Sequence, residues 1–125
     1  MADEIRDDLK YTKTHEWIQL SGKKAKIGIT DHAQHELTDI VFVELPSVGK
    51  QIKKGEELCV VESVKSVSEV YAPVSGTITA VNTKLDESPE VINSSPYDNG
   101  WLVELELQDP AEVNMLLDAA AYKKM

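Results

Sequence analysis

The sequence predicts a mainly β protein in which short antiparallel strands form a sandwich or a flattened barrel. Turn-forming residues, chiefly Gly, Pro and the pairs Ser-Gly and Asn-Gly, recur at short intervals along the 125-residue chain. The short runs between them are rich in β-branched and aliphatic residues. In residues 101–107, the apolar Trp101, Val103, Leu105 and Leu107 alternate with Leu102, Glu104 and Glu106, the period of a strand with one solvated face. A chain of this length can bury one core, so we expect a single domain over residues 1–125.

Seven strands and a few helices are predicted, in a fixed order. After an N-terminal extension of about residues 1–9, the strands are residues 16–20, 25–30, 39–45, 58–64, 67–71, 77–81 and 101–107. Asp31 with Gln34 predicts a short helix, and Ser88-Pro89 predicts a single turn. Asp109-Pro110 supplies an N-cap and a proline at the first helical position, and Glu112, three residues after the cap, completes a capping box. A C-terminal helix that packs one apolar stripe on the sheets is therefore expected over about residues 110–122.

The charge and cysteine content narrow the classes of function. The chain has 13 Lys and Arg against 22 Asp and Glu, and its net charge of −9 argues against nucleic-acid binding. Cys59 is the single cysteine, which excludes an intramolecular disulfide and favours a reducing compartment. The N-terminus lacks the apolar core of a secretory signal, and no apolar run approaches the ~20 residues of a membrane span. We expect a cytoplasmic protein with neither nucleic acid nor membrane among its partners.

A lysine lies at the centre of the near-palindromic run VVESVKSVSEV. Two β-prone arms about a short polar centre predict a hairpin with Lys65 at its tip. If Lys65 and Ser66 formed the tip, Glu62 would face Glu69, and like charges opposite one another destabilise a ladder. Moving the tip by one residue, to Val64 and Lys65, separates the two glutamates. We favour this second register.

A hairpin lysine admits two interpretations. Its primary amine on a four-carbon stem suits an amide-linked cofactor, which a modifying enzyme and several active sites must all reach. The flanking ladder would keep the attachment point rigid while the long side chain moves. Alternatively, Lys65 is one of many solvated turn lysines. The local pattern alone leaves both interpretations open.

Eight short segments spread over nearly the whole chain form a specific pattern. They are residues 11–17 (YTKTHEW), 27–34 (IGITDHAQ), 39–46 (DIVFVELP), 61–65 (VESVK), 71–76 (YAPVSG), 88–90 (SPE), 93–97 (NSSPY) and 100–101 (GW). In this order they resemble the glycine cleavage H-protein family of lipoyl carriers. The resemblance implies a barrel-sandwich hybrid of two antiparallel sheets, of the lipoyl/biotinyl-carrier type, with short helices and a C-terminal helix.

The resemblance also implies a function. It implies a non-catalytic carrier with lipoate amide-linked to Lys65, in which the cofactor does the chemistry. The carrier moves the aminomethyl group of glycine from a pyridoxal-phosphate glycine decarboxylase to a tetrahydrofolate-dependent aminomethyltransferase. It then passes reducing equivalents to dihydrolipoyl dehydrogenase. A lipoate-attaching enzyme must recognise the chain, which we expect to be a monomer.

By the same resemblance, two sets of residues serve the arm. The loaded arm folds into a cleft that holds a cationic amine, and the matching positions are Thr14, Glu16 and Glu69. Thr14 stands where serine is commoner and Glu69 where aspartate is commoner, so both keep the functional group. Solvated surface is the alternative interpretation of these positions. Recognition of the attachment site is expected from its neighbours Glu62, Ser63, Val64 and Ser66, which otherwise supply ordinary hairpin polarity.

Other functions fit the sequence less well. Biotin carriers bracket their lysine with methionines, whereas Val64 and Ser66 stand here. No motif of an independent enzyme is present. His32 and His35 are interpreted as a polar helix face, so no metal site is predicted. Cys59 is interpreted as a core residue. The alternative carrier function is to relay lipoate to 2-oxoacid dehydrogenases or to serve lipoate-dependent sulfur metabolism.

Overall fold

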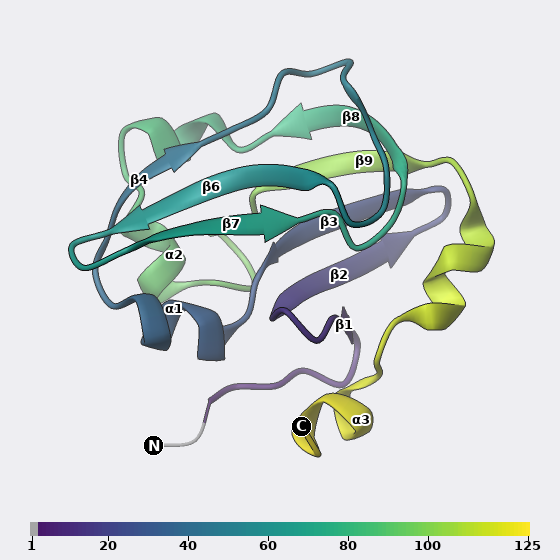
Figure 1. The fold of residues 1–125 in the computed structure, drawn as a ribbon, viewed down its shortest axis with the longest axis horizontal. Helices are drawn as coiled ribbons and strands as arrows, with labels where there is room; N and C mark the ends of the chain where they lie inside the picture. The colour runs from purple at the N-terminus through teal and green to yellow at the C-terminus, as the bar shows by residue number, and fades with distance from the viewer. Residues whose placement is uncertain (1–2) are drawn as a thin grey trace.

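The computed structural model describes residues 3–125, which form two antiparallel β-sheets packed against each other (Figure 1). The larger sheet has the strand order β1-β2-β3-β9-β8-β5 and the smaller β4-β6-β7, so the sheets do not close into one barrel. The strands are β1 (Lys10–Tyr11), β2 (Glu16–Ser21), β3 (Lys24–Ile29), β4 (Ile40–Glu44), β5 (Gln51–Ile52), β6 (Glu57–Ser63), β7 (Val67–Tyr71), β8 (Gly76–Val81) and β9 (Val103–Leu107). The predicted mainly β fold class is confirmed. Residues 1 and 2 of the predicted N-terminal extension lie outside the described residues.

The main core lies between the two sheets. Ile18 and Ile27 face each other across β2 and β3 and are fully buried, as is Val61 of β6. Val43 of β4 and Val70 of β7 complete the wall from the smaller sheet. Full burial of one such side chain stabilises the fold by roughly 1.5–3 kcal/mol. The inward positions of the strands therefore hold the hairpin base in place.

A second, aromatic cluster joins the two ends of the chain to the larger sheet. The rings of Tyr11 and Tyr122 stack at 4.5 Å between centroids. Trp17 is fully buried beside them and donates its indole N–H to the carbonyl of Pro96 at 2.9 Å. This cluster packs the C-terminal helix against the start of the chain, as Figure 1 shows.

Short helices lie at one end of the sheets, close to the β6–β7 turn (Figure 1). They are α1 (Asp31–Leu37), α2 (Val91–Ser94) and the 3₁₀ helix Thr83–Asp86. The short helix predicted from Asp31 and Gln34 is α1, and Thr30 caps it by accepting the N–H of Ala33 at 3.2 Å. Asn93 of α2 donates to the carbonyl of Thr38 at 2.7 Å and so ties the two helices together. Within residues 3–125, no helix has the length and apolar character needed to span a bilayer.

The predicted single C-terminal helix over about residues 110–122 is wrong in its continuity. The structure has the 3₁₀ helix Pro110–Met115 and then α3 (Ala119–Lys123). Between them Leu117 exchanges two backbone hydrogen bonds with Tyr11, at 2.7 and 2.8 Å. Because the N–H and C=O of Leu117 are both used in this strand-like pairing, they cannot also form the hydrogen bonds of a continuous helix. The side chain of Asp118 then caps α3 by accepting the backbone N–H of Ala121 at 2.8 Å.

Candidate functional site

The β6–β7 hairpin presents Lys65 to solvent. Glu62 faces Val67 across the ladder, so Val64 and Lys65 form the tip and the predicted register is confirmed. Lys65 is exposed, and no residue between positions 3 and 125 forms an ion pair or hydrogen bond with its ammonium group. Figure 1 shows the turn between β6 and β7 projecting at the edge of the molecule. A partner can therefore reach this amine directly.

One side chain, Ser63, organises the turn around that lysine. Its hydroxyl accepts the backbone N–H groups of Lys65 and Ser66, at 3.3 and 3.1 Å. Its own N–H donates to the carbonyl of Ser66 at 2.8 Å. The N–H of Val64 donates to the carbonyl of Asp39 at 3.0 Å, which anchors the tip to the α1–β4 connection. The backbone at Lys65 is thus fixed while its side chain stays free.

Ser63→Ala should lower the free energy of unfolding by about 1 kcal/mol, because it removes the acceptor of two turn N–H groups. Equilibrium denaturation in urea measures this loss. Ser66→Ala is the matched control, since the Ser66 hydroxyl makes no hydrogen bond within residues 3–125. Equal effects of the two substitutions would show that the Ser63 hydroxyl does not hold the turn.

The other predicted recognition residues surround the tip without bonding to Lys65. Val64 is 66% exposed, and Ser66 is also exposed. Glu62 is half-buried and lies opposite Phe42 of β4 on the outer face of the smaller sheet. These side chains are placed where an approaching protein would contact them.

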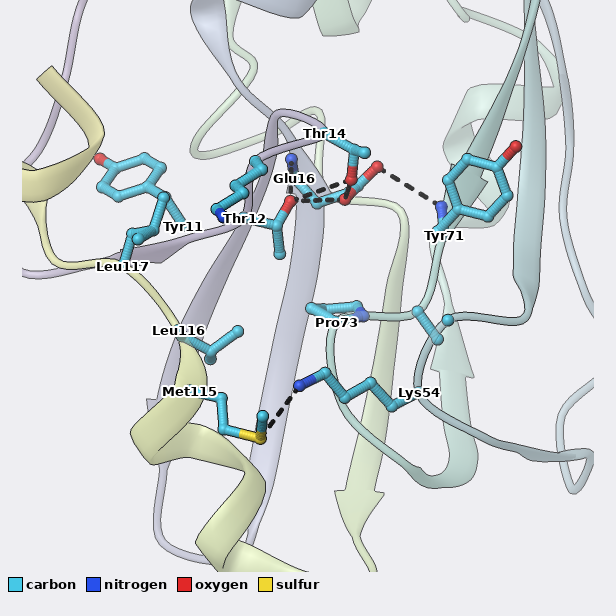
Figure 2. Close-up of a pocket in the computed structure, with 13 residues that line it drawn as sticks. Tyr11, Thr12, Thr14, Glu16, Lys54, Tyr71, Pro73, Met115, Leu116 and Leu117 are labelled. Atoms are coloured by element: carbon cyan, nitrogen blue, oxygen red, sulfur yellow. Dashed lines mark hydrogen bonds between the residues drawn. The ribbon is translucent and has the colours of Figure 1, made fainter. Parts of the chain in front are cut away.

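A second group of polar side chains surrounds Glu16 at the start of β2. Glu16 is 2% exposed, and its Oε1 accepts hydrogen bonds from the hydroxyls of Thr12, at 2.6 Å, and Thr14 (Figure 2). His15 has a left-handed backbone (φ 68°), which turns the loop so that both hydroxyls meet the carboxylate. The Oε2 atom lies 3.4 Å from the N of Tyr71 on edge strand β7, a long contact that leaves room for a further donor.

Thr12 was missed by the sequence reasoning. Its hydroxyl also accepts the backbone N–H of Glu16 at 3.1 Å, so Thr12 orients the buried carboxyl group through two contacts. The sequence signal that could have indicated Thr12 is its position four residues before Glu16, within the segment 11–17 that belongs to the family pattern. Such a signal is common in polar loops, and only the left-handed turn at His15 makes it specific.

Burial raises the pKa of Glu16 above its ordinary range, and the hydrogen bonds from Thr12, Thr14 and Tyr71 only partly offset this. The folded protein therefore keeps a proton on Glu16 at pH values where the unfolded chain has lost it. This contribution to the free energy of unfolding is present below the ordinary carboxyl pKa and is lost as pH rises through the raised pKa.

Glu16→Gln should remove that pH dependence. The free energy of unfolding of the wild type, relative to the variant, should fall as pH rises from about 4 to about 8. Urea denaturation at a series of pH values measures the difference. Glu87→Gln, which removes an exposed carboxylate, controls for the loss of one acidic group. A wild type–variant difference that stays constant across this range would contradict the raised pKa.

Two cavities share Thr14 and Glu16. The smaller, of about 340 Å³, is bounded by β7 and α1 and also receives Glu69. The structure thus brings the three predicted cleft residues onto the lining of one cavity. Its apolar walls are Ile29, Ala33, Leu37 and Val70.

The larger cavity, of about 490 Å³, lies beside the same glutamate (Figure 2). Its walls include Tyr71 at the end of β7, Pro73 just after that strand, and Leu116 of the C-terminal segment. At its mouth the amine of Lys54 lies 3.3 Å from the sulfur of Met115. The sequence did not predict this cavity, because the segments that line it are far apart in the chain.

Cys59 belongs to the core and not to the site. It is 4% exposed within β6, as the sequence predicted, and burial raises the pKa of its thiol above the usual range. A thiol in this state is a poor nucleophile.

An exposed lysine on a rigid hairpin, in a fold of two antiparallel sheets, defines a carrier protein of the lipoyl and biotinyl type. The family model described as Glycine cleavage H-protein matches residues 9–125. The chain therefore belongs to the glycine cleavage H-protein family.

Individual relatives agree with this assignment. The glycine cleavage system H protein of Endomicrobium trichonymphae is 56% identical over 121 residues, which cover 97% of this chain and 98% of the relative. That of Bacillus subtilis (strain 168) is 52% identical over 121 residues, covering 97% and 95%. A crystal structure of a glycine cleavage system H protein from Mycobacterium marinum is 39% identical, with a TM-score of 0.88 over 96% of this chain and 97% of that one.

Proposed function

We propose that Lys65 carries lipoate in amide linkage, and that the chain presents this arm to the enzymes of glycine cleavage in turn. The proposed partners are a pyridoxal-phosphate glycine decarboxylase, a tetrahydrofolate-dependent aminomethyltransferase and dihydrolipoyl dehydrogenase. The observation that carries the proposal is the free ammonium group of Lys65 on a turn fixed by Ser63, in a member of this family.

The chain supplies position, and the cofactor supplies chemistry. When attached, lipoate provides a dithiolane that carries the glycine-derived group and then two electrons. The protein fixes the attachment point through the turn bonds of Ser63 and the ladder between β6 and β7. We therefore infer a non-catalytic carrier; the cytoplasmic location and monomeric state expected from the sequence stay predictions.

Reach selects the smaller cavity for the arm. About eleven bonds separate the Cα of a lipoylated lysine from its ring, which is roughly 14 Å when extended. Glu69 lies four residues from Lys65, or roughly 13 Å along a strand, and lines the smaller cavity. Tyr71, where the larger cavity begins, is roughly 20 Å away. An extended arm therefore reaches Glu69 of the smaller cavity, whereas the Tyr71 side of the larger cavity lies beyond its end.

The smaller cavity suits a cationic cargo. Glu16 is buried with spare accepting capacity on Oε2, and a protonated amine there would stabilise its ionised form against the cost of burial. Thr14 and Glu69 add a hydroxyl and a second carboxylate to the same lining. The apolar walls, such as Leu37, would keep water from the arm's reactive end.

Glu16→Gln also tests this cavity. The amide keeps the shape of the side chain but cannot form the ion pair, so protein loaded with the glycine-derived cargo should release it by hydrolysis faster than the wild type. Ammonia release from the purified loaded protein gives the rate. An unchanged rate would remove Glu16 from the proposed cavity function, while leaving attachment at Lys65 untouched.

Recognition is proposed to involve the residues around the tip. Val64 and Ser66 are exposed beside the lysine, and Glu62 lies one strand position before the turn. A lipoate-attaching enzyme must bind this hairpin before any other partner does. The acidic side chain of Glu62 would favour basic surfaces on such partners.

Glycine–bicarbonate exchange with a cognate decarboxylase separates glycine cleavage from the alternative function as a lipoate relay. Lipoylated protein should support exchange, because the decarboxylase must pass its product to the arm. A lipoylated protein that supports no exchange, but donates lipoate to a 2-oxoacid dehydrogenase subunit, would make the chain a relay carrier. Unlipoylated protein is the control and should be inactive in both assays.

A further inference from the structure

Three side chains of metal-ligand type converge beside the start of α1, outside the carrier site. Asp3, Asp31 and His35 each offer an oxygen or nitrogen atom, and these atoms lie within 4.8 Å of one another. Asp3 and His35 are 32 positions apart in the chain. Folding of the N-terminal segment beneath α1, visible in Figure 1, brings them together.

A second histidine reaches the same carboxylate. The Oδ1 of Asp3 lies 2.5 Å from Nδ1 of His35, and its Oδ2 lies 2.9 Å from Nδ1 of His32. Histidines spaced i, i+3 share one face of a helix, and here both imidazole rings turn their Nδ1 atoms toward Asp3. Asp31 is itself oriented, because it accepts the N–H of Glu4 at 2.7 Å. The donor atoms are therefore positioned before any ligand arrives.

The surroundings of this cluster favour a cation. Asp3, His32, His35 and Glu36 line one surface hollow. Among residues 3–125, the ion pairs of Asp3 and Glu36 are with histidines alone, and Asp31 has none. When the imidazoles are neutral, no Lys or Arg among the described residues pairs with these carboxylates within 4.0 Å, although Lys123 lines a neighbouring hollow with Asp3. A divalent cation would balance the charge of the carboxylates.

We propose that Asp3, Asp31 and His35 form a binding site for a divalent transition metal of the zinc class, beside His32, which contacts Asp3. Imidazole nitrogen and carboxylate oxygen are donors that zinc accepts together. The metal would bind Nδ1 of His35 in place of the proton shared with Asp3, and a neutral imidazole would then carry its single proton on Nε2. Bound metal would fasten the N-terminal segment to α1.

This assignment differs from the sequence-based prediction of no metal site. His32 and His35 alone are two ligands on an exposed helix, which is too few for a stable site. Asp3 adds the decisive third position, and only the folded chain shows that it lies next to α1. No residue of the β6–β7 hairpin takes part, so zinc binding can be measured on the unlipoylated protein, although His32 also lines the smaller cavity.

Isothermal titration of the full-length, untagged, metal-free protein with Zn²⁺ tests the proposal. We expect one equivalent to bind, and Co²⁺ in its place to give visible absorption bands of a protein-bound ion. Asp3→Asn and His35→Gln should each weaken zinc binding by ~10-fold or more, since each removes a ligand. Asp7→Asn, at an exposed position in the same N-terminal segment, is the charge-matched control and should bind like the wild type.

Two results would overturn the proposal. One is a wild type that binds no stoichiometric zinc, and the other is a pair of ligand variants that bind as tightly as Asp7→Asn. Far-ultraviolet circular dichroism without metal checks that every variant is folded, which the surface positions of the substitutions favour. A loss of binding with an intact fold in both ligand variants supports the site.

Discussion

Lys65→Arg should leave the protein wholly without lipoate while its stability stays within about 0.5 kcal/mol of the wild type. Arginine keeps the positive charge and the exposed position but offers no primary amine for an amide bond. Because Lys65 is exposed and has no ion pair among the described residues, the fold loses nothing with it. After co-expression with a lipoate-attaching enzyme, intact mass measurement shows the missing lipoate, and glycine–bicarbonate exchange shows the resulting loss of carrier activity. Urea denaturation measures the stability.

Lys23→Arg provides the matched control. Lys23 is an exposed lysine in the tight turn between β2 and β3, so the substitution changes a turn lysine in the same way. It should be lipoylated on Lys65 and active in exchange. Lipoate found on the Lys65→Arg protein would show that the attachment site is misassigned.

Trp17→Ala should cost about 3–5 kcal/mol of unfolding free energy, the largest loss we expect from a single truncation. The indole is fully buried and loses its hydrogen bond to Pro96 as well as its packing. It lies over Gly28 of β3, where a Cβ would come within 2.6 Å of the ring. Because Trp17 directly follows Glu16, the substitution should also loosen the loop that holds Thr12 and Thr14.

Trp101→Ala is the internal comparison for that loss. Trp101 is half-buried and holds Lys26 over its ring at 5.1 Å, so its truncation should cost less than half as much. Urea denaturation followed by the fluorescence of the remaining tryptophan measures each variant. Equal losses would show that burial of Trp17 does not anchor the start of β2.

Local pattern was sufficient for seven of the strands and for the hairpin register. The strand predicted at residues 67–71 has the bounds of β7, because alternation and flanking turns are local properties. Repulsion between Glu62 and Glu69 favoured the register that the structure has. The two-residue strands β1 and β5 were missed, since so short a run carries no period.

Long-range pairing was beyond the sequence. The apolar spacing after Pro110 predicts one helix, but the backbone of Leu117 bonds to Tyr11 and breaks it. Likewise Glu112, expected to complete a capping box, instead accepts the N–H of Ser75 at 2.7 Å. Both misses involve partners far away in the chain that no local propensity reports.

The residues of the candidate sites were likewise predictable where the signal is local and not where it depends on distant parts of the chain. Lys65 and its neighbours could be predicted, because a hairpin tip is a local feature and the family pattern includes it. Thr14, Glu16 and Glu69 were expected together from the family pattern, and the structure places them around one cavity. Asp3 could not be assigned to His35, because that contact depends on the path of the whole N-terminal segment.

Peptide-level mass analysis of the protein purified from its native source tests the central claim most directly. The account predicts one lipoyl group per chain, on the peptide that contains Lys65. A native protein whose mass equals that of its bare polypeptide, or a lipoyl group found on another lysine, would contradict it.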